Sequence, residues 1–293
     1  MQVLNLDEKN TERMDAINKF TLMDDTFMTQ VFSSDLECTE ELLKIILKRD
    51  DLTVTKSVTQ LTIGNLFGRS VRLDIYANDS EGKQYDIEVQ QDDSGAVPER
   101  ARLNSSLFDT RLTTSGSKYT EMPETYIIFI TSNDVLVGGL PIYTIERTVK
   151  ETGKLFNDKA HIVYVNGSYR GDDEVGWLMH DFNCVNYHEM HNAKIAARVR
   201  YFKEEPKGVA DMCKTMQVIV DRERDEAEVS RSKKNRMEYV EKMESMILIK
   251  LQRPHCCPLS RYERLYNKKK SSKNHITEDV AVQGVLPILK AAV

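Results

Sequence analysis

The sequence predicts a mixed α/β domain followed by a helical region, and three observations favour this arrangement. Residues 52–91 are rich in Val, Ile, Thr and Tyr and alternate between apolar and polar positions, as half-buried strands do. Residues 125–132 (TYIIFITS) form a short apolar run suited to a strand buried on both faces. Residues 209–250 are dense in Glu, Arg, Lys and Met, which is typical of a long solvated helix.

The elements can be placed in chain order from caps, alternation and turn residues. Asp35 is an expected N-cap for an apolar helical stripe that ends at the charged residues 48–50. Expected strands lie within 52–65, 70–78, 83–91, 125–132, 141–149 and 160–167, and expected helices within 99–113, 174–180, 189–203 and 209–250. We therefore expect an α/β domain over residues 1–170, with its N-terminal helices, a helical region over 171–253, and an irregular or disordered basic tail over 254–293.

Composition narrows the class of protein. Of 293 residues, 41 are Lys or Arg and 46 are Asp or Glu, and the formal net charge of −5 argues against a broadly basic nucleic-acid-binding surface. The sequence has no apolar run long enough to span a bilayer, and its first twenty residues do not resemble a secretory signal. Five scattered cysteines are typical of a reducing compartment. These features predict a cytoplasmic protein with no membrane partner.

The most informative segment is the expected hairpin SVRLDIYANDSEGKQYDIEVQQ. Because side chains alternate along a strand, Arg72, Asp74 and Tyr76 are expected on one face, and Leu73 and Ile75 on the other. The apolar face can pack inward against a helix. The acidic side chains of the two strands would then point together.

The register decides whether these acids meet. If residues 79–83 form the loop, the opposed pairs are Arg72–Gln90, Asp74–Glu88 and Tyr76–Asp86. Two directly opposed carboxylates repel one another, and a divalent cation would offset this repulsion. Carboxylate oxygens suit Mg²⁺ or Mn²⁺. The alternative is a solvated hairpin whose outer face happens to carry acidic residues.

Asp74, the short hairpin and the run Glu88-Val89-Gln90 resemble the metal-binding core of the PD-(D/E)XK nuclease superfamily. The chain is most similar to the branch of PD-(D/E)XK nuclease family transposases, which is related to the recombination-promoting nucleases. The likeness extends over roughly residues 22–225 and includes the blocks LMDDTFMTQVF and RARLNSS. It implies a restriction-endonuclease-like fold, with a central mixed sheet flanked by helices.

The resemblance also implies roles for individual residues. Asp74 and Glu88 would be metal ligands, and the backbone carbonyl of Val89 a third ligand. Gln90 stands where many relatives carry lysine, and it would position the attacking water. Glutamine is neutral and can only hydrogen-bond, so the charge that lysine would bring has to come from another residue.

Candidates for the remaining roles come from two expected helices. Asp24 is the candidate for an additional acidic catalytic residue, with Glu41 as an alternative. Arg100 and Arg111 lie about three helical turns apart and share a helix face, whereas Arg102 lies off that line. These three arginines could contact phosphates, with Arg100 or Arg102 supplying the missing charge. The alternative is a surface helix whose arginines face solvent.

A second group of side chains lies further along the chain. His180, Cys184, His188 and His191 fall within twelve residues, but their spacing matches no standard zinc finger. Hydrogen-bonded or exposed side chains are the interpretation favoured for these four residues.

Three functions are consistent with the sequence. The leading hypothesis is a Mg²⁺- or Mn²⁺-dependent DNA endonuclease from a mobile-element or recombination-linked family. A second is a nuclease-fold protein with weak or no activity that binds DNA or a protein partner. The third is an acidic assembly protein that forms homo-oligomers through residues 189–250.

Overall fold

The computed structural model describes residues 13–33, 35–64, 70–113 and 116–251. The chain divides into two compact units, Met1–Arg222 and Glu223–Val293. The tail expected at residues 254–293 lies outside the described residues.

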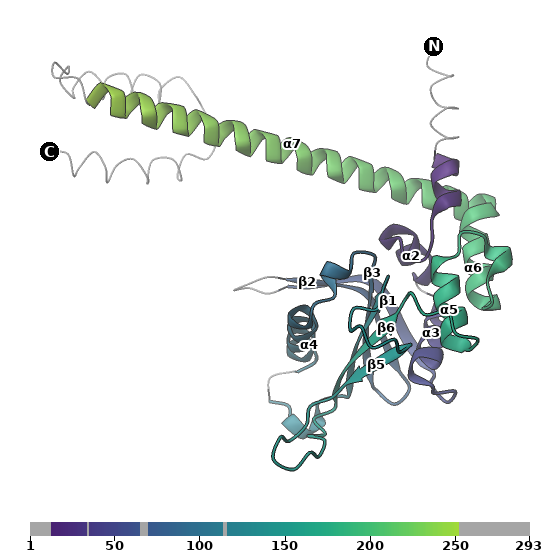
Figure 1. Cartoon of the computed structure of the whole chain (residues 1–293). Helices are drawn as coiled ribbons and strands as arrows, with labels where there is room; N and C mark the ends of the chain where they lie inside the picture. Colours follow the sequence, from purple (N-terminus) through teal and green to yellow (C-terminus); the bar gives the residue numbers. More distant parts are fainter. Residues whose placement is uncertain (1–12, 34, 65–69, 114–115, 252–293) are drawn as a thin grey trace. The chain divides into compact units, whose positions relative to one another are not determined.

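The first unit is built on one mixed sheet of six strands with the order β1-β2-β3-β4-β6-β5 (Figure 1). Strands β1, β2 and β3 are antiparallel neighbours, β3, β4 and β6 run parallel, and β5 pairs antiparallel with β6. The strands are β1 (Val54–Ile63), β2 (Val71–Asp79), β3 (Gln84–Gln90), β4 (Thr125–Thr131), β5 (Ile142–Ile145) and β6 (Ala160–Asn166). This sheet and its flanking helices confirm the predicted fold class.

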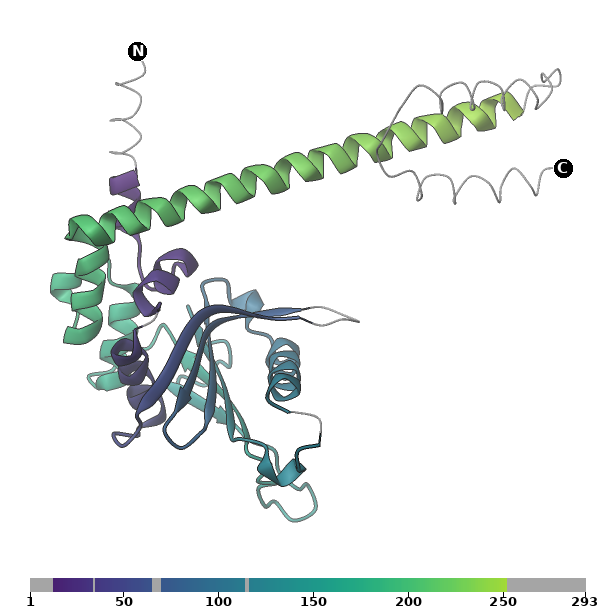
Figure 2. The same cartoon turned by 180° about the vertical axis from the view of Figure 1, so that it is seen from behind.

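Helices cover both faces of the sheet, and Figure 2 shows α4 on the side opposite α3. The helices are α2 (Asp25–Phe32), α3 (Leu36–Leu47), α4 (Pro98–Leu112), α5 (Glu174–Asn183), α6 (Ala193–Glu204) and α7 (Pro206–Leu251), with short 3-10 turns η1 (Asp93–Gly95), η2 (Tyr119–Glu121) and η3 (Tyr187–Glu189). Helices α2, α3, α5 and α6 share one apolar core with the sheet, and α4 shares a second core with the other face.

Strand β4 lies at the centre of the sheet, and its side chains serve both cores. Ile128 and Ile130 belong to the core under α3 and α5, whereas Ile127 and Phe129 belong to the core under α4. All four side chains are fully buried. The predicted strand buried on both faces is therefore confirmed, as expected for a strand with parallel neighbours on both sides.

Helix starts follow the capping residues of the sequence. The Asp35 carboxylate accepts a hydrogen bond from the Cys38 N–H at 2.9 Å, so α3 begins where expected. Helix α6 begins at Ala193 rather than near residue 189, because the Asn192 side chain accepts from the N–H groups of Lys194 and Ile195, each at 3.1 Å. This cap fixes the position of the α5–α6 connection.

The helices after the sheet contribute to its core. Leu178 and Phe182 of α5 and Val199 of α6 are buried in the same cluster as Ile128 of β4. The division at residue 170 stays a prediction, as does an assembly surface within residues 189–250. No described helix contains a stretch that is long and apolar enough to cross a membrane.

Candidate metal centre

The hairpin of β2 and β3 has the register that the apolar alternation predicts. Tyr76 pairs with Asp86, and Ile75 pairs with Ile87. The ladder between the two strands ends at this second pair, so the next residues along, Asp74 and Glu88, lie where the strands part. Two carboxylates therefore enter the space between the strands at a point where no backbone pairing closes it.

Asp74 is held at the point where the strands separate. Its side chain is 6% exposed, and Oδ2 accepts a hydrogen bond from the Val89 N–H at 3.1 Å. This hydrogen bond lies beyond the last backbone pair between β2 and β3, and it orients the carboxylate towards β3. The role of the Val89 carbonyl as a ligand stays a prediction.

The alternation of side chains along β2 changes at Asp74. Leu73 packs with Tyr76 in the core under α4, whereas Ile75 packs in the core on the other face. Arg72 pairs with Asp25 of α2 at 3.1 Å, and it does not take part in the β2–β3 ladder. The prediction that Arg72, Asp74 and Tyr76 share one face is therefore wrong for Arg72.

The neighbouring strand is distorted at the same level of the sheet. Thr59 and Leu61 of β1 pair with Ile75 and Leu73, and between them Gln60 adopts a positive φ of 57°. A non-glycine residue in this conformation locally distorts a strand. The Gln60 side chain donates to Asp25 Oδ1 at 2.9 Å, which ties the distortion to α2.

Glu88 is the most completely enclosed of the predicted ligands. Its side chain has no exposed area, and Oε2 accepts from Arg100 Nη2 at 2.5 Å and from Gln90 Nε2 at 3.3 Å. Oε1 is buried and has no hydrogen-bond partner among the described residues. An ionised carboxylate oxygen without a partner is costly to bury, so this atom is a position at which a cation would be stabilised.

A third carboxylate, Asp86, completes what we call the carboxylate cluster: Asp74, Asp86 and Glu88. Asp86 is fully buried, and its Oδ2 accepts from Asn104 Nδ2 at 3.4 Å. Its Oδ1 has no partner within the described part of the chain. Asp86 was absent from the predicted ligand set, although its alternation with Glu88 already placed both residues on one face.

Burial and mutual repulsion disfavour the charged forms of the cluster. Burial, with a contribution from the nearby Asp25 charge, raises the pKa of Asp74 to about 6. Burial and the charge of Asp74 raise the pKa of Glu88 to about 8. Burial and the charges of Glu88 and Asp74 also raise the pKa of Asp86 well above its usual value. The protein surroundings thus supply too little positive charge to keep all three carboxyl groups ionised.

Gln90 and Arg100 form a connected pair beside Glu88. Arg100 Nη1 donates to Gln90 Oε1 at 2.6 Å and to the carbonyl oxygen of Gly95 at 3.1 Å. A Cβ at Gly95 would lie 2.3 Å from Gln90 Oε1, so the absence of a side chain there leaves room for this contact. The guanidinium is thereby fixed next to Glu88, and its role as the source of the positive charge that glutamine lacks stays a prediction.

The other residues of α4 lie in different surroundings. Arg102 is exposed, and the exposed Arg111 lies over the Tyr76 ring, 5.7 Å from its centroid. Ser105 is buried, and the Ser106 hydroxyl donates to the Arg102 carbonyl oxygen at 2.9 Å. The structure therefore brings Arg100 to the carboxylate cluster and leaves Arg102 and Arg111 exposed on the helix.

The acidic residues considered in the N-terminal helices also lie in different surroundings. Asp24 Oδ2 accepts from the Thr21 N–H at 2.7 Å, and this carboxylate closes the turn before α2. Its neighbour Asp25 is the residue whose charge acts on Asp74. The alternative, Glu41, pairs with Lys194 at 2.8 Å. A catalytic role for Asp24 stays a prediction, and Asp25 is the acidic residue of this region that the structure places near the cluster.

The carboxylate cluster has the donor chemistry of a divalent-cation site. Among the described residues it offers two buried oxygens without hydrogen-bond partners, Glu88 Oε1 and Asp86 Oδ1, and the Asp74 carboxylate lies close enough for its charge to act on both residues. An all-oxygen donor set suits Mg²⁺ or Mn²⁺ better than a softer metal. The same burial raises the pKa values of the three carboxyl groups, because their charged forms lack a counter-ion that would stabilise them.

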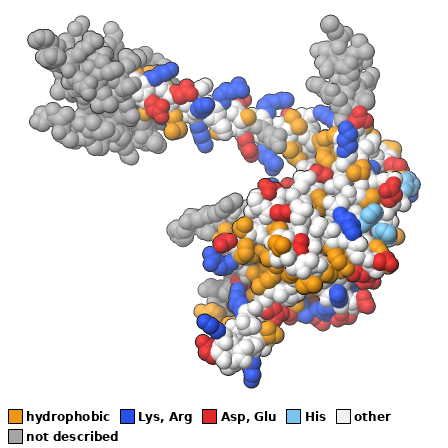
Figure 3. Space-filling view, in the orientation of Figure 1, with side chains coloured by type: hydrophobic (Ala, Val, Ile, Leu, Met, Phe, Trp, Pro, Cys, Tyr) orange, Lys and Arg blue, Asp and Glu red, His pale blue; other side chains and the backbone are white. Residues whose placement is uncertain are grey.

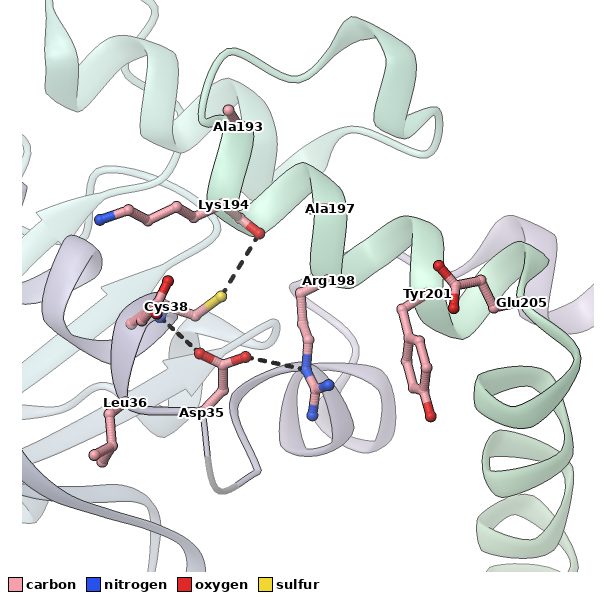
Figure 4. Close-up of a pocket in the computed structure, with 10 residues that line it drawn as sticks. Asp35, Leu36, Cys38, Ala193, Lys194, Ala197, Arg198, Tyr201 and Glu205 are labelled. Atoms are coloured by element: carbon pink, nitrogen blue, oxygen red, sulfur yellow. Dashed lines mark hydrogen bonds and ion pairs between the residues drawn. The ribbon is translucent and has the colours of Figure 1, made fainter.

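An open groove of about 780 Å³ lies elsewhere on this unit, between the start of α3 and α6 (Figure 4). Arg198 Nε pairs with Asp35 Oδ2 across it at 3.3 Å. Burial, together with the charge of Asp35, raises the pKa of the Cys38 thiol to about 12, so this thiol stays protonated and is a poor nucleophile. The groove shares no residue with the carboxylate cluster, and we assign no reaction to it.

Comparison with known proteins gives one family match. Residues 31–168 match the model of a family described as PD-(D/E)XK nuclease family transposase. The matched range contains all six strands, the carboxylate cluster and Arg100. The chain matches no curated protein and no solved structure. Over residues 31–168, this chain is therefore similar to the PD-(D/E)XK nuclease family transposases.

Proposed function

We propose that the protein is a divalent-metal-dependent DNA endonuclease of a transposase or recombination-linked family. The observation that carries this proposal is the pair of buried, unpartnered oxygens on Glu88 and Asp86 next to Asp74, beside the guanidinium of Arg100. The family match supports a nuclease, and it also supports DNA as the substrate.

Asp74, Asp86 and Glu88 would hold Mg²⁺ or Mn²⁺ through these carboxylate oxygens. When bound, such a cation acts as a Lewis acid that stabilises negative charge on the phosphate and eases deprotonation of water. In hydrolysis, the water oxygen joins phosphorus, the bond to one deoxyribose oxygen breaks, and that oxygen takes up a proton. The protein's own side chains would position the water and stabilise the phosphate.

Gln90 and Arg100 would act on the substrate side of the cluster. Because Gln90 Oε1 is occupied by Arg100, the Gln90 amide turns its Nε2 donor towards Glu88, next to the space for the attacking water. Arg100 carries a permanent positive charge, which would stabilise the scissile phosphate in the transition state. Arg102 and Arg111 would contact neighbouring backbone phosphates from the exposed part of α4.

The test is cleavage of supercoiled plasmid by the full chain with Mg²⁺ or Mn²⁺, and with chelator. We expect metal-dependent nicking that Asp74→Ala and Glu88→Gln abolish. Asp79→Asn is the matched control, because Asp79 is a buried carboxylate at the far end of β2 that accepts from Tyr85 at 2.7 Å. This control should lose stability and keep cleavage at low temperature. Equal nicking by wild type and Asp74→Ala would refute the proposal.

One observation favours a second candidate, a nuclease-fold protein that binds DNA without cutting it. Gln90 is neutral, and the Arg100 guanidinium already pairs with Glu88, so it offers the cluster a protein cation in place of a metal. This candidate predicts DNA binding that neither chelator nor Asp74→Ala alters, with no nicking at any metal concentration. Binding measured by fluorescence anisotropy on the same variants separates the two candidates.

A further inference from the structure

A second group of metal-ligating side chains lies outside the carboxylate cluster. His180, Asp181 and His191 each offer one ligand atom, and these three atoms all lie within 4.8 Å of one another. His180 and Asp181 belong to the last turn of α5, and His191 lies in the connection just before the α6 cap. This group differs from the four residues considered in the sequence. It includes Asp181 and leaves out Cys184 and His188.

The two excluded residues have partners of their own. The Cys184 thiol donates to the Asn186 carbonyl oxygen at 3.1 Å, and the His188 ring packs against Tyr187 with 4.1 Å between the ring centroids. Sequence spacing alone could not distinguish these residues from the true neighbours. The fold of the chain between α5 and α6 brings His191, and not Cys184 or His188, next to His180 and Asp181.

The Asp181 side chain is held in place by backbone hydrogen bonds. It has no exposed area, its Oδ1 accepts from the His191 N–H at 2.8 Å, and its Oδ2 accepts from the Asn192 N–H at 2.7 Å. His180 Nδ1 lies 3.2 Å from Oδ1. Adjacent helical residues normally diverge by about 100°, so this contact shows that the His180 ring turns back towards Asp181. The carboxylate is thus oriented before any ion arrives, as a good ligand should be.

The two imidazoles are placed to complete a site that opens to solvent. The rings of His180 and His191 meet edge to face, with centroids 5.0 Å apart. His191 is exposed and His180 is partly exposed, and Figure 3 shows histidine side chains in pale blue at the surface on this side of the molecule. One buried carboxylate and two accessible imidazoles leave a fourth position for water.

We propose that His180, Asp181 and His191 form a second metal site, which binds Zn²⁺ or a similar transition-metal ion. Two nitrogens and one oxygen are a donor set that such ions prefer, whereas Mg²⁺ prefers oxygens alone. The ion would bridge the end of α5 to the start of α6 and so stabilise the connection between them. The carboxylate cluster contributes no residue to this site, so the proposal does not depend on nuclease activity.

The chain carries a reporter for this site. Trp177 is its single tryptophan, and its ring stacks on His191 with a centroid distance of 5.8 Å. An ion bound to His191 would therefore change the fluorescence of Trp177. The experiment uses the full chain without an affinity tag, freed of metal with a chelator, and titrated with Zn²⁺ and separately with Mg²⁺.

We expect a saturable fluorescence change with Zn²⁺ and none with Mg²⁺ at the same concentrations. His180→Ala should weaken Zn²⁺ binding by about tenfold or more, since even neighbours of metal ligands contribute that much. The variant leaves the Trp177–His191 stack in place, so the reporter is retained. His188→Ala is the matched control, and it should bind as wild type does.

Two further measurements make the result decisive. Equilibrium dialysis is carried out in an Asp74→Asn/Glu88→Gln background, which removes two of the three carboxylates of the other cluster. One Zn²⁺ per chain should then be lost with either His180→Ala or His191→Ala. His191→Ala keeps the backbone N–H that donates a hydrogen bond to Asp181, so the variant should fold. Circular dichroism checks that it does. Equal Zn²⁺ binding by wild type and His180→Ala, or no saturable binding by wild type, would overturn the proposal and leave the endonuclease proposal unaffected.

Discussion

Arg100 and Glu88 form an ion pair at the centre of the predicted active site, with 2.5 Å between Nη2 and Oε2. Glu88 is fully buried and Arg100 is partly exposed, so Arg100 is the solvent-facing member of the pair. The pair joins α4 to β3. In the proposed function, the positive charge that a neutral glutamine at residue 90 lacks would come from the helix instead of the strand.

Arg100→Ala should lower the cleavage rate by about 100-fold, the scale observed when one preorganised charge donor is lost. Glu88 would also lose the interaction that lowers its pKa, so proton uptake by Glu88 should weaken metal binding as well. The measurement is the plasmid nicking rate as a function of Mn²⁺ concentration. Arg102→Ala, on the exposed side of the same helix, is the control and should change the rate by less than about fivefold. Equal losses for the two variants would contradict the role of Arg100.

Gln90→Lys should reduce activity, although the superfamily resemblance implies lysine at this position. Gln90 Oε1 accepts from Arg100 at 2.6 Å, and a lysine offers no acceptor and repels the guanidinium. We expect a loss of about tenfold or more in the nicking rate. Gln91→Lys adds the same charge at the exposed neighbouring residue and should leave the rate near that of wild type. A Gln90→Lys variant that cuts faster than wild type would show that Arg100 does not supply the missing charge.

Metal stabilisation should depend on pH in a defined direction. The pKa values of Asp74 and Glu88 are raised to about 6 and about 8, so without metal the stability that their protonated forms contribute is complete below about pH 4 and is lost as the pH rises through these values. A cation competes with these protons. The gain in melting temperature from Mg²⁺ or Mn²⁺ should therefore be larger near pH 8.5 than near pH 5.5. Differential scanning fluorimetry measures it, and Asp74→Asn should lose most of the pH dependence.

Asp25→Asn and Asp24→Asn should have different effects, although the two residues are adjacent. Asp25 adds negative charge next to Asp74, so its loss should weaken Mn²⁺ binding and lower the nicking rate several-fold. Asp24 closes the turn before α2 through Thr21, so its loss should lower the melting temperature and affect cleavage less. Both quantities are measured on both variants. The reverse pattern would return the catalytic role to Asp24.

Lys203 provides a prediction about stability alone. Its Nζ donates to the carbonyl oxygens of Asn18, Phe20 and Val185 at 3.2, 2.7 and 2.6 Å. Lys203→Met would leave these buried acceptors without a donor, which should cost about 1–3 kcal/mol in the free energy of unfolding. Urea unfolding near pH 7 measures this difference. A loss below about 0.5 kcal/mol would mean that water replaces the ammonium.

The same lysine has a pH signature. Burial lowers the pKa of Lys203 from 10.5 to about 8. Between these values the unfolded chain holds the proton and the folded chain does not, so folding gains stability as the pH rises from about 8 to 10.5. The stability difference between wild type and Lys203→Met should therefore widen over this range.

The sequence was sufficient for the parts of the fold that depend on local patterns. Apolar alternation predicted the pairing of Tyr76 with Asp86, because a shift by one residue would have turned the apolar face outwards. The Asp35 cap and the buried run of β4 were predicted in the same way. These features depend on neighbours in the chain or on the period of a single element.

The remaining features depend on contacts between distant elements. The change of face at Asp74 lies opposite the positive φ of Gln60 on the neighbouring strand, and the sequence of a single strand gives no sign of either feature. Asp25 rather than Asp24 lies near the carboxylate cluster because of how α2 packs against β2. Asp181 joins the histidine group because of how the chain folds between α5 and α6. Arg100 was a candidate because of the family resemblance, but only the packing of α4 on the sheet separates it from Arg102.

The core shared by the sheet with α5 and α6 has a practical consequence for shortening the chain. A fragment trimmed at residue 168, where the family match ends, would uncover Ile128 and Val165 of the sheet by removing Phe182 and Val199 from above them. Such a fragment should aggregate when expressed. The shortest version suitable for crystallisation or binding assays should retain every residue up to Arg222, the end of the first compact unit.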